Sequence, residues 1–87
     1  MKVTVRYFAS LRKALGSGES LDLAAGATVG ELRDALMRSS ARHAQALGRS
    51  RALRCALNQV LCDEATPLLT LGLEAAEVAF FPPVTGG

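Results

Sequence analysis

A single strongly amphipathic helical segment in the middle of the chain, with strand-like segments on both sides, restricts the possible folds most. Thr28 and Glu31 have the spacing of a capping box, in which the Thr hydroxyl accepts a backbone N–H and the Glu side chain reaches back to the cap. The charged residues that follow, Arg33 among them, are expected largely outside the apolar face. That face recurs at helical spacing and predicts packing on a core: Val29, Leu32, Ala35 and Leu36.

The first residues of the chain predict a half-buried strand. Residues 2–8 alternate, with Val3, Val5 and Tyr7 on one face and mostly polar side chains on the other. Phe8 falls on the polar face, where an aromatic side chain either covers a neighbouring loop or belongs to a surface for a partner. Both interpretations stay open at this point.

Two short segments connect this strand to the main helix. Residues 10–16 predict one helical turn that Ser10 caps and Gly16 ends. Residues 19–23 alternate again and predict a second strand, antiparallel to the first if the connection is hairpin-like.

The second half of the chain predicts further short strands. Residues 54–62 suggest two strands joined by a tight turn at Asn58-Gln59, and residues 77–81 suggest the last strand. Residues 41–50 are compatible with a short helix or a loop. The resulting fold class is α+β, with the main helix packed on one face of a mixed sheet.

The composition fits one globular domain. At 87 residues the chain is near the lower limit for a self-standing core, and 49% of its residues are apolar against 21% charged. No apolar stretch approaches the ~18 residues of a membrane span, so we expect a cytoplasmic protein without a membrane partner. Cys55, Cys62 and His43 are too few for a disulfide framework or a zinc site, and both cysteines are expected to pack as small hydrophobic residues.

The basic residues are concentrated in the first part of the chain, because all ten Lys and Arg lie within residues 1–54. Such a stretch is either a patch for nucleic acid or an acidic partner, or a solvated helix end and loop. Few aromatic residues accompany the arginines, so nucleic acid is not the expected partner. Five arginines fall where no acidic residue intervenes: Arg38, Arg42, Arg49, Arg51 and Arg54.

No segment has the pattern of a self-contained active site. The cysteines have no catalytic signature, and no nucleophile is recognised near His43 in the sequence. The glycines form neither a Walker loop nor a dinucleotide fingerprint. We therefore do not expect the chain to be an enzyme.

The C-terminal run offers a different chemistry. Proline cannot donate to a sheet ladder, so Pro82 and Pro83 must end the last strand. Residues 1–81 are then the domain, and residues 82–87 are a flexible tail that can extend about 20 Å. The tail delivers the Gly87 carboxylate, which is ionised at neutral pH and able to attack the α-phosphorus of ATP to give an acyl-adenylate.

The last ten residues, Val78-Ala79-Phe80-Phe81-Pro82-Pro83-Val84-Thr85-Gly86-Gly87, closely resemble the C-terminal motif of the small, sulfur carrier subunits of molybdopterin synthase. Most of the chain continues the resemblance, except residues 38–52. One further departure is an apolar stretch between Pro67 and Glu77, which replaces a short Asp-Gly-Asp-like turn of the family. The matching upstream segments are Val3 to Phe8 with Ala9 and Arg12, Thr28-Val29 with Leu32, and Ala56-Leu57-Asn58-Gln59 with Leu61.

This resemblance implies a ubiquitin-like β-grasp fold and a non-catalytic role in molybdenum cofactor biosynthesis. A ubiquitin-activating-like adenylyltransferase would use ATP to activate Gly87, and a sulfur donor protein would convert the adenylate to a thiocarboxylate. The tail would then enter the large catalytic subunit of the synthase, within a heterotetramer, and give sulfur to cyclic pyranopterin monophosphate. The chain itself would bind no cofactor and no metal.

The resemblance also assigns residues to these steps. The docking surface for the large subunit would contain Phe8, Leu61 and Phe81, with a place in the core as the alternative for Leu61 and Phe81. The residues that would thread into the partner are Pro82, Pro83, Val84, Thr85 and Gly86.

Two other functions fit the sequence. A carrier of the same fold for thiamine or cysteine biosynthesis would differ in its partners, and the Phe-Phe-Pro-Pro-Val-Thr spacing before Gly-Gly favours the molybdopterin carrier. A small basic nucleic-acid-binding domain is the alternative from another class, and salt-dependent binding to DNA or RNA would identify it.

Overall fold

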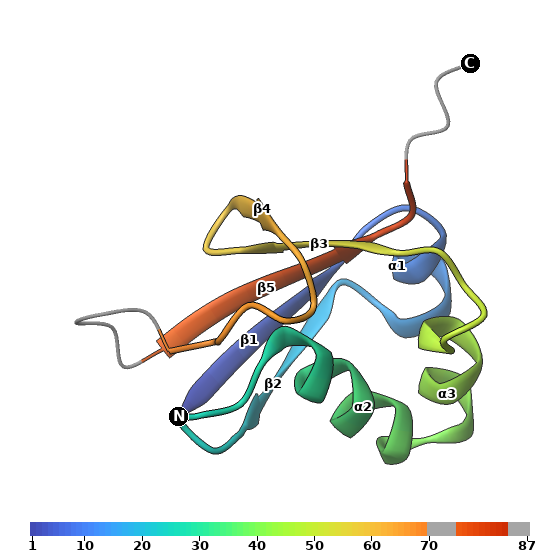
Figure 1. The fold of residues 1–87 in the computed structure, drawn as a ribbon. Coiled ribbons are helices and arrows are strands. Elements are labelled where there is room, and N and C mark those ends of the chain that lie inside the picture. The colour runs from blue at the N-terminus through green and yellow to red at the C-terminus, as the bar shows by residue number, and fades with distance from the viewer. Residues whose placement is uncertain (70–74, 84–87) are drawn as a thin grey trace.

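The computed structural model describes residues 1–69 and 75–83, and Figure 1 shows its helices gathered on one side of a sheet. The strands of this part of the chain form one mixed sheet in the order β2-β1-β5-β3-β4, in which β1 and β5 are parallel and the other neighbours are antiparallel. The predicted α+β class is confirmed. The elements are β1 (Lys2–Tyr7), α1 (Ser10–Leu15), β2 (Gly18–Asp22), α2 (Val29–Ser39), α3 (Ala41–Leu47), β3 (Arg54–Leu57), β4 (Val60–Cys62) and β5 (Ala75–Phe81).

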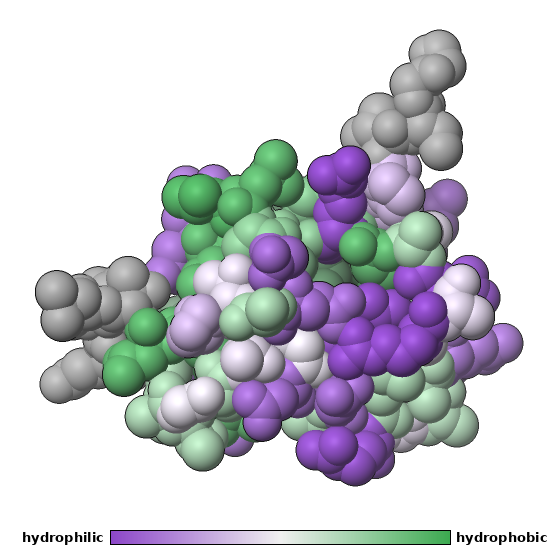
Figure 2. Space-filling model, viewed as in Figure 1, coloured by the Kyte–Doolittle hydropathy of each residue, from purple (hydrophilic) through white to green (hydrophobic). Residues whose placement is uncertain are grey.

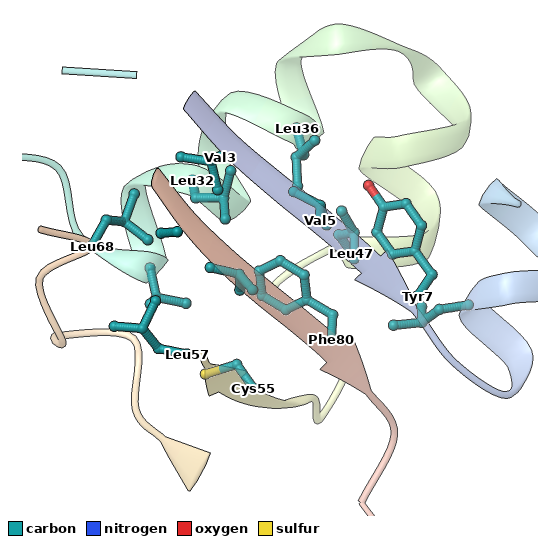
Figure 3. Packing of buried hydrophobic residues seen from close by; sticks show 14 of the residues in the cluster. Val3, Val5, Tyr7, Leu32, Leu36, Leu47, Cys55, Leu57, Leu68 and Phe80 are labelled. Carbon is teal, nitrogen blue, oxygen red and sulfur yellow. The ribbon is translucent and has the colours of Figure 1, made fainter. Parts of the chain in front are cut away.

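The core lies between the helices and one face of the sheet, as Figure 3 shows. The alternation predicted for β1 is confirmed, because Val3, Val5 and Tyr7 are buried and the residues between them are exposed. Each helix adds apolar side chains to this layer: Leu11 from α1, Val29, Leu32 and Leu36 from α2, and Ala46 and Leu47 from α3. None of the helices in the described residues is long and apolar enough to cross a membrane.

The start of α2 has the capping box that the sequence predicts. The Thr28 hydroxyl accepts the Glu31 backbone N–H at 3.2 Å, and the Glu31 carboxylate accepts the Thr28 N–H at 3.0 Å. These two bonds satisfy donors that the first helical turn otherwise leaves without partners.

The start of α1 differs from the prediction. The cap of α1 is Ala9, which has a φ of 55° and makes no side-chain capping bond, so the prediction that Ser10 caps this helix is wrong. The chain turns sharply there, with the Leu11 N–H bonded to the Phe8 carbonyl at 3.2 Å. Gly16 ends the helix with a φ of 89°, a region that favours glycine.

Residues 41–47, which the sequence left open between helix and loop, form α3. The Ser40 hydroxyl accepts the His43 N–H at 3.0 Å and so caps the helix. Ala46 and Leu47 are buried in the core, which stabilises so short a helix by packing.

The apolar stretch after Pro67 begins with one buried and one exposed leucine. Leu68 is fully buried, and its N–H bonds to the Ala27 carbonyl at 2.9 Å, whereas Leu69 is 51% exposed. Leu71 and Leu73, which belong to the same predicted stretch, lie outside the described residues.

Candidate functional site

The candidate site begins where β5 ends. β5 stops at Phe81, immediately before Pro82 and Pro83, as the sequence predicts. Both prolines are half-buried and belong to no strand. Residues 84–87, with Gly86 and the Gly87 carboxylate, lie outside the described residues, so their assigned roles stay predictions.

The three predicted docking residues lie on one face of the sheet, opposite the helices, which we call the open face. In β5, Val78 and Phe80 point into the core, so Ala79 and Phe81 point to the open face. The register then gives the other members of this face, because Ala79 lies opposite Ala56, which in turn lies opposite Leu61. Arg6 also lies beside Ala79, and Phe8 follows Arg6 by two residues.

Phe8 continues the ladder of β1 but keeps much of its ring in contact with solvent. Its N–H bonds to the Phe80 carbonyl at 3.2 Å, and the side chain is 41% exposed. The Arg6 guanidinium lies 5.8 Å from the centre of the ring, within cation–π range. Of the two interpretations of Phe8, this exposure favours a partner surface over a cover for a loop.

The β3–β4 hairpin presents the second apolar part of the open face. Asn58 and Gln59 form its turn with φ values of 49° and 71°, as predicted for a tight turn. Two bonds hold this turn on β5, from the Asn58 N–H to the Glu77 carbonyl at 2.7 Å and from the Glu77 N–H to the Asn58 amide oxygen at 2.9 Å. The outer strand of the hairpin is therefore fixed through its turn as well as through β3.

Leu61 is 65% exposed and its neighbour Val60 is 67% exposed, so the alternative that places Leu61 in the core is wrong. Phe81 is half-buried. Figure 2 shows apolar side chains gathered over the β3–β4 hairpin. Exposed apolar residues that share one face are typical of a protein interaction surface.

The arginine-rich part of the chain differs from its prediction. Arg33, expected on the polar face of α2, is 3% exposed. Its guanidinium donates to the carbonyl oxygens of Leu47 at 2.7 Å and Gly48 at 2.7 Å, and to Glu64 at 2.9 Å. The helix therefore buries a cation because the end of α3 and the loop after β4 supply its acceptors.

Arg49 is also paired, although no acidic residue lies near it in the sequence. It donates to Asp34 at 2.6 Å and forms an ion pair with Glu64. These two hydrogen bonds raise the pKa of Arg49 above its usual value. The described structure thus brings acidic groups to a segment that the sequence shows as purely basic.

A cluster of polar side chains joins β1 and β2 to α3. The Tyr7 hydroxyl donates to Glu19 at 2.7 Å, and the Nε2 atom of His43 lies 2.6 Å from the same carboxylate oxygen. Ser40 Oγ lies 2.7 Å from Nδ1 of His43, so the structure gives this histidine a hydroxyl neighbour that the sequence analysis missed. Since Ser40 also caps α3, we assign the cluster a bracing role.

The cluster changes the acidity of its members. Burial alone would raise the pKa of the Glu19 carboxyl, but hydrogen bonds with His43 and Tyr7 outweigh it and hold the pKa below its usual value. Burial, assisted by the bond to Glu19, raises the pKa of the Tyr7 hydroxyl well above its usual value. The ionised carboxylate is therefore the form that the fold stabilises.

Cys55 is buried in the core, as predicted for a small hydrophobic residue, and Cys62 is half-buried. Within residues 1–69 and 75–83, no three His, Cys, Asp or Glu side chains come together in a group that could hold a metal ion.

Comparisons with known proteins show the family of the chain. Residues 5–87 match the model of the ThiS family. The chain is 39% identical, over 85 residues that cover 98% of it and 99% of the relative, to the molybdopterin synthase sulfur carrier subunit of Escherichia coli (strain K12). The chain therefore belongs to the ThiS family.

Similar solved structures identify the fold. A structure of the complex of subunits 1 and 2 of the molybdopterin-converting factor from Helicobacter pylori 26695 contains a chain with a TM-score of 0.64 and 26% identity, with 100% of both chains covered. A ubiquitin of Caldiarchaeum subterraneum matches with a TM-score of 0.60 over 100% of this chain and 98% of that one, at 19% identity, which bears on the fold alone. The predicted ubiquitin-like β-grasp fold is confirmed.

Proposed function

We propose that this protein is the sulfur carrier subunit of a molybdopterin synthase and that its reacting group is the Gly87 carboxylate. The observation that carries the proposal is the 39% identity to the Escherichia coli carrier over 98% of the chain. A relationship over the whole length makes a shared function a better explanation than a shared fold alone, since one fold hosts many functions.

The chemistry proceeds in two activation steps. A carboxylate oxygen of Gly87 attacks the α-phosphorus of ATP on an adenylyltransferase, which releases pyrophosphate and leaves an acyl-adenylate. A donor protein then supplies sulfur at the oxidation level of sulfide, which attacks the acyl carbon, displaces AMP and leaves a thiocarboxylate. The chain contributes the carboxylate and a position for it, while the activating enzyme contributes the nucleotide site.

The open face supports the proposal that a large catalytic subunit is the partner. Phe8, Leu61 and Phe81 lie on this face, and the first two are 41% and 65% exposed. β5 leads directly from this face to Pro82 and the tail. A subunit that covers the apolar face is therefore in position to receive the tail, where sulfur would pass to cyclic pyranopterin monophosphate.

The intact mass of the protein tests the proposal. After incubation with ATP, a sulfur donor and an adenylating enzyme, we expect a mass gain equal to the exchange of one oxygen atom for one sulfur atom. A protein that lacks Gly87 is the matched control and should keep its mass. An unchanged mass of the complete chain with competent partners would overturn the proposal.

The same measurement separates this reaction from persulfide formation on Cys55 or Cys62. A persulfide adds a whole sulfur atom and loses no oxygen, and reduction with a thiol removes it, whereas the thiocarboxylate exchange survives thiol treatment. A gain of whole sulfur atoms alone would therefore count against the carboxylate as the acceptor.

A further inference from the structure

Cys55 and Cys62 form a pair across the β3–β4 hairpin. They lie directly opposite each other in the register of the two strands, and both are free thiols. Their Sγ atoms are 3.7 Å apart, and Cys55 Sγ also lies 3.4 Å from the Cys62 carbonyl oxygen. The two sulfur atoms therefore already face each other.

The backbone at this pair suits a covalent bond between the two residues. Opposed residues of antiparallel strands have Cα atoms about 4.5 or 5.5 Å apart, and disulfides span about 4.4–6.8 Å between Cα atoms. To form the S–S bond of about 2.05 Å, the two side chains need only rotate, and the strand register is kept. The turn at Asn58-Gln59, which is bonded to Glu77, already fixes that register.

The pair is also within reach of small molecules. Cys55 and Cys62 line a cavity of about 430 Å³, together with Arg54, Asp63 and Pro83. Cys62 is the more exposed of the two thiols, because Cys55 is only 5% exposed. A reagent that enters the cavity therefore meets the sulfur atom of Cys62 first.

We propose that Cys55 and Cys62 are a reversible redox site, which forms an intrachain disulfide by exchange with a low-molecular-weight disulfide. In the first step, the Cys62 thiolate attacks the small disulfide, forms a mixed disulfide and releases one small thiolate. In the second step, the Cys55 sulfur attacks Cys62 Sγ, forms the Cys55–Cys62 bond and releases the second small thiol. The protein loses two electrons and two protons, and the small disulfide is reduced to two thiols.

The surroundings of Cys55 determine the rate of the second step. Burial raises the pKa of the Cys55 thiol to about 12, and only the thiolate is an effective nucleophile. Closure should therefore be slow at neutral pH and accelerate as the pH rises. The mixed disulfide on Cys62 is the intermediate expected to accumulate.

The disulfide would act on β4, which lies at one edge of the sheet. β4 contains three residues and, among the residues that the structure describes, pairs only with β3, so few backbone bonds hold it there. A covalent bond would join β4 to β3 and restrict the opening of the hairpin that presents Leu61. This inference does not depend on the proposed sulfur carrier function, because it rests on the hairpin alone.

The experiment uses the full chain, equilibrated with mixtures of oxidised and reduced glutathione, quenched with acid, then unfolded and treated with iodoacetamide. We expect a monomer that has lost two hydrogen atoms and takes up no alkyl group, and that returns to two alkylated thiols after reduction. Alkylation of the unfolded chain ensures that burial of Cys55 is not mistaken for a disulfide. We also expect the oxidised form to melt about 5–15 °C higher than the reduced form.

Two single variants test the order of events. Cys55→Ala should collect a stable mixed disulfide with glutathione on Cys62, whereas Cys62→Ala should stay largely reduced because its remaining thiol is buried. Two alkylated thiols in the wild-type protein at every glutathione ratio would overturn the proposal, and so would a product that is only a mixed disulfide or a disulfide-linked dimer. The wild-type result decides the matter even if a variant fails to fold.

Discussion

Replacement of Arg33 by Met tests how much the buried guanidinium contributes to the fold. The methionine side chain keeps most of the aliphatic volume but removes all donors. The guanidinium donates to Leu47 O at 2.7 Å, Gly48 O at 2.7 Å, Arg51 O at 3.2 Å and Glu64 at 2.9 Å. The change thus leaves several acceptors near the end of α3 without this partner.

The magnitude follows from these contacts. Each buried polar group left unsatisfied costs about 1–3 kcal/mol, and removal of one partner from a buried ion pair costs about 3–5 kcal/mol. The Glu64 side chain is 36% exposed, so water recovers part of its loss. We therefore expect the free energy of unfolding to fall by about 3–5 kcal/mol, and the melting temperature to fall by at least about 12 °C.

Urea unfolding followed by far-UV circular dichroism measures this loss, and Arg38→Met is the matched control. Arg38 lies on the same helix but is exposed, and surface substitutions usually change stability by no more than about 0.5 kcal/mol. If Arg33→Met destabilised the protein no more than Arg38→Met, the reasoning from the buried contacts would be refuted.

Three further predictions concern the open face, the tail and the polar cluster. Phe8→Ala should weaken binding of the large subunit at least about tenfold in calorimetry, with little change in melting temperature; a loss of several kcal/mol of stability would instead place Phe8 in the core. Deletion of Gly87, or addition of one residue after it, should abolish sulfur transfer with an unchanged melting temperature, because one residue displaces the carboxylate by about 3.3 Å; restored cofactor synthesis in carrier-deficient cells by the deletion variant would rule out Gly87. Because the fold lowers the pKa of Glu19, its stabilising contribution is present above the unfolded-state pKa near 4.5 and is lost as the pH falls through the folded-state pKa. Glu19→Gln should therefore destabilise the protein most at pH 7, and its cost in urea unfolding should shrink steadily as the pH is lowered below about 4.5. A cost that does not change with pH would contradict this.

The strands of the fold could be predicted because their signals are local. In β1 every second side chain is buried, and the two residues with positive φ between β3 and β4 are an Asn and a Gln at a predicted tight turn. The capping box of α2 spans only four residues. Such patterns depend only on residues that are close in the sequence, so they can be recognised without knowledge of the tertiary contacts.

The burial of Arg33 could not be predicted in this way. Its acceptors are Leu47, Gly48 and Arg51, 14 to 18 positions away, and Glu64, 31 positions away. Only the packing of α2 against α3 brings these oxygens to one side chain. A helical pattern in isolation assigns an arginine outside the apolar face to solvent, and for Arg33 the tertiary contacts make that assignment wrong.

The cysteine pair is a different case, because its signal was present in the sequence. A two-residue turn at Asn58-Gln59 places Leu57 opposite Val60, Ala56 opposite Leu61 and Cys55 opposite Cys62. The register of a hairpin follows from its turn. The predicted turn therefore already implied that the two thiols are neighbours.

The position of β5 determines how the domain responds to a pull on its C-terminal end. β5 lies between β1 and β3 and forms ladders with both. A force applied through Pro82 acts along the strand and loads both ladders in shear, so many backbone bonds must break together. A strand at the edge of the sheet would instead peel away one bond at a time. A partner that pulls on the tail therefore pulls on a strand that is held on both sides in the middle of the sheet, and the domain should stay folded while the tail is bound and released.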